Sequence, residues 1–561
     1  MKKELCLLIA LLCTTVSLAA QKTATFFQKT YKSNVDTAAL TFQSVARTTD
    51  GGYALMGNYQ NATNNGDMMV IRTDSLGNVA WTFDFASDTI ESATGIRQTL
   101  DGGFVICGWN SSPVDFTKGE MLLAKVDASG ALKWSTQFGG SDVDEAGDVA
   151  VLNSGDIVVA GRSPEVVGGA FSAYFLLTRA NGVPENGQFI RFGTAASTFS
   201  SIDKTLDGGS IASGYTGTFL QRTGFDAMIV KFNNQGAIQW GKRYATAGTQ
   251  FSSTIRQTRD TGYILIGQQA VTQPNGSVPQ TFYVIKTKAN GDTLWCKSFD
   301  TGKFEFARSV TEVSDGYIIS GYTTTGIDTV RYRNQAGVDT FAIQDRQTAF
   351  AMKLDRSGVF KWGKLYGDST RTSRLYSSTL AYDGGVTLVG ETFGYGHRYG
   401  AGFVVHIDRE GNIGAGTGCQ IRNLAFTSGS FVVTDSSNVV SIEAGEEKVS
   451  NLRKAAITII KTDICSGTGL NTDVADYHLP DNTVQLFPNP TRNQLTVQIN
   501  EEAFGTQPAT IRIYDAVGRL KHTEKTINDR VDINVSHYAS GIYFLRMEQN
   551  GKFLVKKFIV E

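Results

Sequence analysis

The sequence predicts an all-β protein: a seven-bladed β-propeller, a small β segment and a C-terminal Ig-like β-sandwich. Glycine is abundant and proline scarce, with 60 Gly and 9 Pro in 561 residues, which indicates many tight turns. A phrase built on Asp-Gly returns at a spacing of about fifty residues, the mark of a repeat architecture. Short alternating strands separated by Pro, Asn and Gly turns fill the C-terminal end, as in a β-sandwich.

Residues 1–20 predict a cleaved export signal. Two lysines precede an apolar run from Leu5 to Leu12, and small residues for cleavage follow at Ala19 and Ala20. A lipid anchor at Cys13 is the alternative, but the bulky Leu12 precedes it where such sites have a small residue. No later stretch has the 18 to 20 apolar residues of a membrane helix, roughly the length needed to span a bilayer, so we expect no transmembrane segment in the mature chain.

Charge and histidine content exclude several partners. The chain has 52 basic and 53 acidic residues, so nothing favours nucleic acid or an anionic membrane, which need clustered excess Lys and Arg. It has five histidines, and no two have metal-ligand spacing. We therefore expect no metal and no cofactor.

The first repeated phrase is an Asp-Gly hairpin that ends in a glycine. A second hairpin follows most copies and ends in a tryptophan (Trp81, Trp134, Trp240, Trp295 and Trp362). Two hairpins make a four-stranded unit, which cannot bury both faces alone, so seven units are expected to pack in a ring. The seven copies run from Asp50 to Gly57, Asp101 to Gly108, Ser154 to Gly161, Asp207 to Gly214, Asp260 to Gly267, Asp315 to Gly321 and Asp383 to Gly390.

The N-terminal strand favours a closed ring over an open solenoid. The seventh copy has no Trp strand, while residues 23–31 resemble the strand around Trp81. We expect the first strand to complete the last blade within a propeller over residues 21–415, since closure removes exposed edges. The recurrent Asp residues are interpreted as turn formers rather than Ca²⁺ ligands, and the Trp set as packing between blades.

These repeats resemble secreted bacterial β-propeller families built on Asp-Gly-Gly hairpins. The Asp-x-x-Gly-x-x-x-Trp phrase is similar to the tryptophan-docking motif of quinoprotein-type propellers. The resemblance implies a fold but no activity, because some quinone sites include a vicinal disulfide and no two cysteines are adjacent here.

The period stops after the seventh copy. Residues 416–466 contain strand-like runs without the repeated phrase, and Cys419 and Cys465 bracket them. A disulfide between these two is our hypothesis for an oxidising compartment. A polar linker over residues 467–483 follows.

Three motifs occur in order over residues 484–561, namely residues 484–490, residues 513–519, and residues 540–545 with 556–561. Together they closely resemble the type A C-terminal sorting domain of the type IX (Por) secretion system of Bacteroidota. The resemblance implies Sec export, passage across the outer membrane, the secretion machinery and a sortase-like peptidase as partners, and a secreted or surface-attached product. The positions that match the family motifs are Pro488, Asn489, Pro490, Gly518, Arg519, Gly541 and Lys556.

Candidate ligand residues lie in the long loops of the repeat. These loops are rich in Arg and aromatic residues, which dominate binding hot spots and carbohydrate platforms; self-packing of long loops explains them equally well. We predict a surface-displayed binding protein for a glycan or a protein. A secreted polysaccharide hydrolase or lyase at the channel mouth and a structural envelope component remain open, although no catalytic motif occurs. The loop residues are Arg331, Tyr332, Arg333, Tyr395, His397, Arg398 and Tyr399.

Overall fold

The computed structural model divides into two compact units, residues 1–470 and 471–561. Strands, turns and loops make up the described residues, and no helix occurs among them, so none there is long and apolar enough to cross a membrane. The predicted signal lies outside this part. The described residues are 24–35, 38–60, 66–86, 89–111, 119–139, 143–164, 169–192, 195–217, 224–246, 248–271, 278, 280–333, 339–397, 399–413, 421–431, 433–436, 439–443, 447–449, 453–455, 459–469, 484–499, 509–515, 520–526, 528, 530–549 and 552–561.

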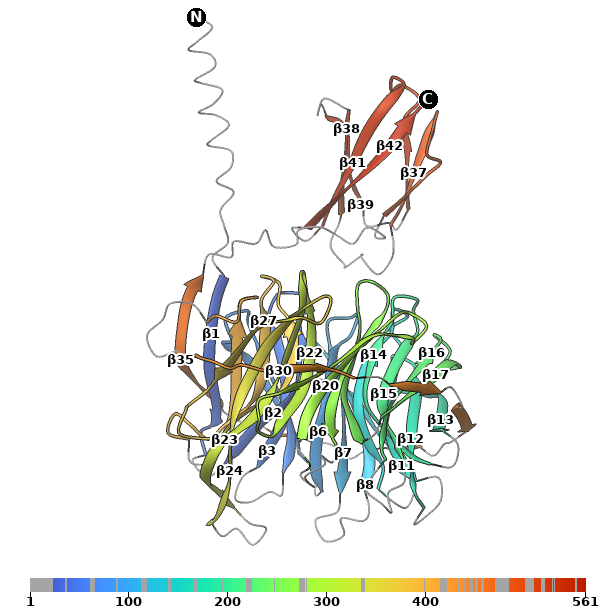
Figure 1. Ribbon diagram of the computed structural model, residues 1–561. Coiled ribbons are helices and arrows are strands. Elements are labelled where there is room, and N and C mark those ends of the chain that lie inside the picture. The colour runs from blue at the N-terminus through green and yellow to red at the C-terminus, as the bar shows by residue number, and fades with distance from the viewer. Residues whose placement is uncertain are drawn as a thin grey trace, which may run out of the picture. The chain divides into compact units, whose positions relative to one another are not determined.

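Unit 1 contains seven antiparallel sheets, which we number I to VII (Figure 1). Sheet I consists of β2 (Ala39–Arg47), β3 (Tyr53–Gln60), β4 (Asp67–Thr73) and β5 (Val79–Ala86), and sheet II of β6 (Ile90–Gln98), β7 (Phe104–Ser111), β8 (Gly119–Val126) and β9 (Leu132–Phe138). Sheet III consists of β10 (Glu145–Val151), β11 (Ile157–Pro164), β12 (Phe171–Thr178) and β13 (Pro184–Phe192), and sheet IV of β14 (Ala196–Lys204), β15 (Ser210–Gly217), β16 (Asp226–Phe232) and β17 (Ile238–Ala245). Sheet V consists of β18 (Thr249–Gln257), β19 (Tyr263–Ala270), β20 (Gln280–Thr287) and β21 (Thr293–Asp300). Sheet VI consists of β22 (Glu305–Val313), β23 (Gly316–Arg333), β24 (Asp339–Asp355) and β25 (Phe360–Tyr366). Sheet VII consists of β26 (Ser373–Leu380), β27 (Val386–Thr392), β28 (Ala401–Ile407) and β1 (Ala24–Ser33).

The sheets contact one another in a closed cycle. The first strand of each sheet lies against the first strand of the next, and β26 of sheet VII contacts β2 of sheet I. The tryptophan of one sheet lies over a turn glycine of the following sheet, as Trp81 does over Gly130. Its indole N–H donates to the carbonyl of Ala128 at 3.1 Å. The predicted packing role of the tryptophans is confirmed.

Sheet VII takes its fourth strand from the N-terminal end of the unit. β1 pairs antiparallel with β28, the position predicted for residues 23–31. Tyr31 of β1 donates to the carbonyl of Gly77 in sheet I at 2.7 Å. Tyr366 makes the equivalent bond to Gly411, from sheet VI to sheet VII, at 2.9 Å. The N-terminal strand therefore docks on its neighbour as an ordinary fourth strand does.

The segment predicted as an extra β segment contributes seven strands between residues 422 and 469, which we call the belt. It adds one strand to the outer edge of each sheet, in the order VI, V, IV, III, II, I and VII. Figure 1 shows these orange-brown strands, β30 among them, crossing the sheets. The belt strands are β29 (Arg422–Asn423), β30 (Thr427–Ser430), β31 (Thr434–Ser436), β32 (Val439–Glu443), β33 (Glu447–Val449), β34 (Arg453–Ala455) and β35 (Ile459–Gly469).

The belt ends beside the sheet on which it begins. β29 pairs with β25 of sheet VI, and β35 pairs along the whole of β1 in sheet VII. Cys465 of β35 is bonded in a disulfide, and the buried Cys107 and Cys296 are free. Cys419 lies outside the described residues, so its pairing with Cys465 stays a prediction.

The recurrent turn aspartates are held by basic side chains of the third strands, which supports their predicted structural role. Lys231, for example, is 3% exposed and lies 3.0 Å from Asp207. The equivalent pairs are Asp50–Arg72, Asp101–Lys125, Asp260–Lys286, Asp315–Lys353 and Asp383–His406.

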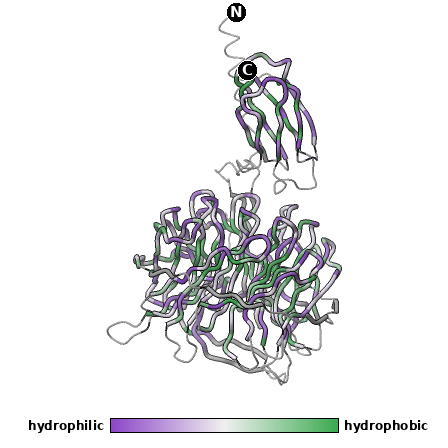
Figure 2. The backbone as a smooth tube through the Cα atoms, turned by 90° about the vertical axis from the view of Figure 1, so that its right-hand side faces the viewer, coloured by the Kyte–Doolittle hydropathy of each residue, from purple (hydrophilic) through white to green (hydrophobic). Residues whose placement is uncertain are grey.

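Unit 2 consists of two small antiparallel sheets around an aliphatic core. Along β38, buried residues alternate with half-buried ones, the period expected of a strand with one face on a core. In Figure 2 hydrophobic stretches lie along the strands, while the turns of the chain are largely hydrophilic. One sheet consists of β36 (Val484–Phe487), β37 (Gln494–Ile499) and β40 (Arg530–Asn534). The other consists, in spatial order, of β39 (Leu520–Thr526), β38 (Ala509–Asp515), β41 (Gly541–Gln549) and β42 (Lys552–Val560).

Buried carboxyl groups lie near the boundaries between sheets of unit 1. Asp84 of sheet I is 3% exposed. Its burial, and then the charges of Asp67 and of Glu91 in sheet II, raises its pKa to about 7. Burial likewise raises the pKa of Glu305 in sheet VI to about 7.

These two groups are expected to make unit 1 less stable as pH rises. Each keeps its proton in the folded chain at pH values where the unfolded chain has released it, so its contribution is complete below the ordinary carboxyl pKa and is lost as pH rises through about 7. Asp84→Asn should raise the free energy of unfolding by on the order of 3 kcal/mol at about pH 8 and change it little at about pH 4.

Urea unfolding of both proteins at the two pH values measures this difference. Asp345→Asn, at an exposed position of β24, is the matched control. An effect of Asp84→Asn that is the same at both pH values would contradict the assignment.

Candidate functional site

Every first strand of the seven sheets carries a β-bulge at the same point of the repeat. The register with the second strand skips one residue there. Bulges re-aim a side chain and occur often beside functional sites. The bulge positions are Gln43, Thr94, Gly147, Ser200, Ser253, Arg308 and Tyr376.

The glycine that ends each repeated phrase is required by this bulge. A Cβ on Gly57 would lie 1.8 Å from the Thr41 carbonyl oxygen, and one on Gly214 would lie 1.7 Å from that of Thr198. The same backbone approach occurs at all seven copies. Only glycine fits there, so the glycines are part of the scaffold.

The residue after each of these glycines differs from sheet to sheet. We call these the post-glycine positions, and together with the bulge positions they form the variable ring. Within a sheet the two positions touch: Arg308 donates to the hydroxyl oxygen of Tyr322 at 2.9 Å, and Tyr376 donates to Glu391 at 2.7 Å. The post-glycine positions are Asn58, Trp109, Arg162, Tyr215, Gln268, Tyr322 and Glu391.

Arginine, tyrosine and glutamate side chains of sheets VI and VII contact one another. The guanidinium of Arg308 lies 5.6 Å from the ring centre of Tyr322 and 6.0 Å from that of Tyr376. The two tyrosine rings meet edge to face at 6.0 Å. Phe306 stacks on Tyr322 at 4.9 Å. We call Arg308, Tyr322, Tyr376, Arg374 and Glu391 the Arg308 cluster.

Glu391 is the only carboxylate of that cluster, and it is fully engaged. It accepts from Arg374 at 2.6 Å, from Tyr376 at 2.7 Å and from Thr41 of sheet I at 2.9 Å. Burial, and then the charge of Glu391, raises the pKa of Tyr376 well above its ordinary value. The Tyr376 hydroxyl therefore stays protonated and acts as a donor.

The other side of the ring repeats this chemistry more sparsely. Arg162 of sheet III forms a two-pronged bond with Glu145, at 3.0 and 2.7 Å, and lies 4.4 Å from the ring centre of Phe171. Tyr215 meets Phe251 edge to face at 5.0 Å. Glu391 of the ring and the neighbouring Glu145 are thus both paired with arginine, and no group of three metal-ligating side chains suited to a metal ion occurs among the described residues.

The predicted loop with Arg331, Tyr332 and Arg333 is the end of a long hairpin. β23 and β24 pair up to Arg333 and Asp339, and the side chains of the three predicted residues lie outside the described part. Asp328 ties the hairpin to sheet VII by accepting from Arg371 at 3.1 Å.

The second predicted loop packs on the N-terminal strand. Tyr395, with a positive φ of 57°, accepts a hydrogen bond from Gln28 of β1, and His397 lies 2.9 Å from the Thr30 hydroxyl. Tyr399 is buried, and Arg398 lies outside the described residues. A ligand role for the residues of both loops stays a prediction.

Sequence reasoning missed the variable ring. The signal was present, because the residue after the repeated glycine takes six different types in the seven copies. The bulge residues give no comparable signal, since nothing in the sequence distinguishes Arg308 from an ordinary strand residue.

In unit 2, the Pro-Asn-Pro turn meets the C-terminal strand. The Asn489 side chain accepts from the backbone N–H of Ile559 at 2.9 Å, and the Thr491 N–H donates to the Ile559 carbonyl at 2.9 Å. Of the predicted motif residues, Gly541 begins β41 and Lys556 lies in β42, whereas Gly518 and Arg519 lie outside the described part.

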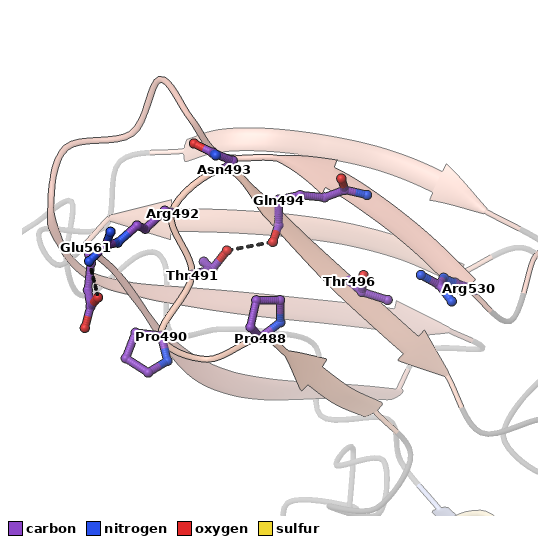
Figure 3. A pocket seen from close by; sticks show the side chains of 9 residues that line it. All are labelled: Pro488, Pro490, Thr491, Arg492, Asn493, Gln494, Thr496, Arg530 and Glu561. Atoms are coloured by element: carbon purple, nitrogen blue, oxygen red, sulfur yellow. Dashed lines mark hydrogen bonds and ion pairs between the residues drawn. The ribbon is translucent and has the colours of Figure 1, made fainter.

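An open pocket of about 620 Å³ lies beside this turn (Figure 3). Arg492 lies 3.5 Å from the Glu561 side chain, and Arg530 lies at the opposite end of the pocket in the view of Figure 3. The lining residues are Pro488, Pro490, Thr491, Arg492, Asn493, Gln494, Thr496, Arg530 and Glu561.

Comparison with known proteins identifies no informative relative of unit 1. No curated protein matches the chain. Among solved structures, a xylan β-1,4-xylosidase from Bacillus halodurans C-125 is 8% identical, with a TM-score of 0.28, over 72% of this chain and 99% of that one. A likeness at this level carries no argument about fold or activity.

Unit 2 has a clear relative. Residues 485–561 match the family model described as the secretion system C-terminal sorting domain, in agreement with the three motifs. The chain therefore ends in a sorting domain, which supports secretion through the type IX system and attachment at the cell surface.

Proposed function

We propose that this chain is a cargo of the type IX secretion system whose unit 1 is a closed seven-bladed β-propeller that binds a glycan at the variable ring. The closed cycle of sheet contacts and the completion of sheet VII by β1 support the propeller. A ring of variable side chains on a repeated scaffold is where binding function is expected.

The Arg308 cluster is the observation that favours a glycan. Tyrosine and phenylalanine rings stack on sugar faces, and arginine and glutamate side chains bond to hydroxyl groups. Five residues of these types converge there within hydrogen-bond or ring-contact distance. A hydrolase is less well supported, because Glu145 and Glu391 are both held by arginines rather than free to transfer protons.

Replacing an aromatic side chain of the cluster should weaken glycan binding. We expect Tyr376→Ala to lower affinity at least about tenfold, or about 1.4 kcal/mol, because a stacking surface and a donor are lost. A glycan array identifies the ligand, and calorimetry on the purified mature protein measures the change. Tyr382→Ala, at an exposed turn tyrosine, is the control, and thermal melts check that both variants fold.

Unchanged affinity in Tyr376→Ala would show that the glycan does not bind at the variable ring. If a Tyr395→Ala/Arg398→Ala variant loses binding instead, the glycan binds at the loops predicted from the sequence.

Unit 2 is proposed to be recognised by the secretion machinery and removed by a sortase-like peptidase when the cargo is attached to the surface. Deleting residues 484–561 should leave the protein in the periplasm. Protease treatment of intact cells followed by fractionation measures its location, and the Tyr376→Ala variant, exported normally, is the control. Surface display of the truncated chain would contradict this role.

We further propose that Cys419 is the partner of Cys465, so that the disulfide fastens the two ends of the belt across sheets VI and VII. Peptide mapping of the secreted protein without reduction should yield a peptide pair linked through these two cysteines. Cys465→Ser should lower the free energy of unfolding by about 4 kcal/mol in the loop-entropy model. Recovery of Cys419 as a free thiol would refute the pairing.

A further inference from the structure

The two arginines of the variable ring, Arg162 and Arg308, and the neighbouring Arg374 of the Arg308 cluster differ in their counter-charges. Arg162 is bonded to Glu145 and Arg374 to Glu391. Arg308 has no carboxylate within ion-pair distance among the described residues, and its Nε has no hydrogen-bond partner there. Arg308 is therefore the one ring arginine in the described part whose charge the chain leaves without a counter-charge.

The surroundings of Arg308 make that charge significant. Its side chain is half-buried at a bulge of β22, between the rings of Tyr322 and Tyr376. Cation–π contacts offset only part of the cost of removing a guanidinium from water. A charge that is partly desolvated and unpaired favours an anionic ligand group, which a planar guanidinium binds with two parallel hydrogen bonds.

We propose that Arg308 binds the carboxylate of an acidic sugar, so that the ligand of the variable ring is a uronic acid-containing glycan. This inference rests on the proposed glycan binding and adds the chemical class of the glycan. Tyr376 and the buried Tyr322 flank the guanidinium, so a pyranose ring stacked on the half-buried Tyr376 carries its carboxylate within reach of Arg308. Nη2 of Arg308 already donates one N–H to Tyr322 and Nε is buried, which leaves Nη1 and the second N–H of Nη2 to donate to the ligand.

The test compares glycans that carry a carboxylate, its uncharged ester or a sulfate group. The full mature protein is titrated calorimetrically with oligogalacturonate, with the methyl ester of oligogalacturonate, and with a sulfated oligosaccharide of similar length that has no carboxylate. We expect wild type to bind the acid at least about tenfold more tightly than the ester, and Arg308→Gln to lose that preference while it keeps the affinity for the ester. Arg308→Lys keeps the positive charge but cannot donate two parallel hydrogen bonds. Its preference for the acid over the ester should therefore lie between those of wild type and Arg308→Gln.

Arg356→Gln, at a turn arginine outside the ring that bonds to the Ser314 carbonyl, is the matched control and should behave as wild type. Thermal melts confirm folding of every variant. An unchanged acid preference in Arg308→Gln, or tighter binding of the sulfated probe than of the acid, overturns the carboxylate assignment and leaves glycan binding standing. Binding of an acidic peptide but of no oligosaccharide overturns both proposals.

Discussion

The unpaired backbone groups at the edges of the seven sheets are the constraint on which unit 1 depends. A four-stranded sheet leaves an outer edge with free N–H and C=O groups, which invites association with other chains. The belt covers all seven outer edges with strands of the same chain. β1 bonds to β28 on one side and to β35 on the other, so the beginning and the end of unit 1 are joined in sheet VII.

This closure gives the variable ring a rigid support. Each bulge is fixed by a glycine against which the first strand packs without room for a side chain, so the neighbouring residues are free to vary while the backbone stays the same. The Asp–Lys pairs and the Trp contacts hold the opposite hairpin turns and the sheet boundaries. The scaffold and the proposed site thus use different positions of one repeat.

The sequence predicted those parts of the fold that repeat. Asp-Gly turns, the docking tryptophans and the placement of β1 depend on local residue chemistry that recurs in most copies. The belt was not predictable as a belt, because strands as short as Arg422–Asn423 or the fully exposed Thr427–Ser430 have no hydrophobic period and form only by pairing with distant edges. The Arg308 cluster was missed because its residues lie in the strands of the repeated hairpins. The sequence prediction instead chose residues of the segments expected to be long loops, such as residues 322–347.

Hydrogen exchange of β1 in the full secreted protein tests the closure most directly. Backbone amides of residues 24–33 are predicted to exchange as slowly as those of β27 and β28, because both edges of β1 are bonded and it leaves sheet VII only when unit 1 unfolds. Peptides from the exposed turn around Tyr382 supply the fast-exchanging reference. Exchange of β1 within seconds, with β27 and β28 still protected, would contradict a unit closed by its own first strand.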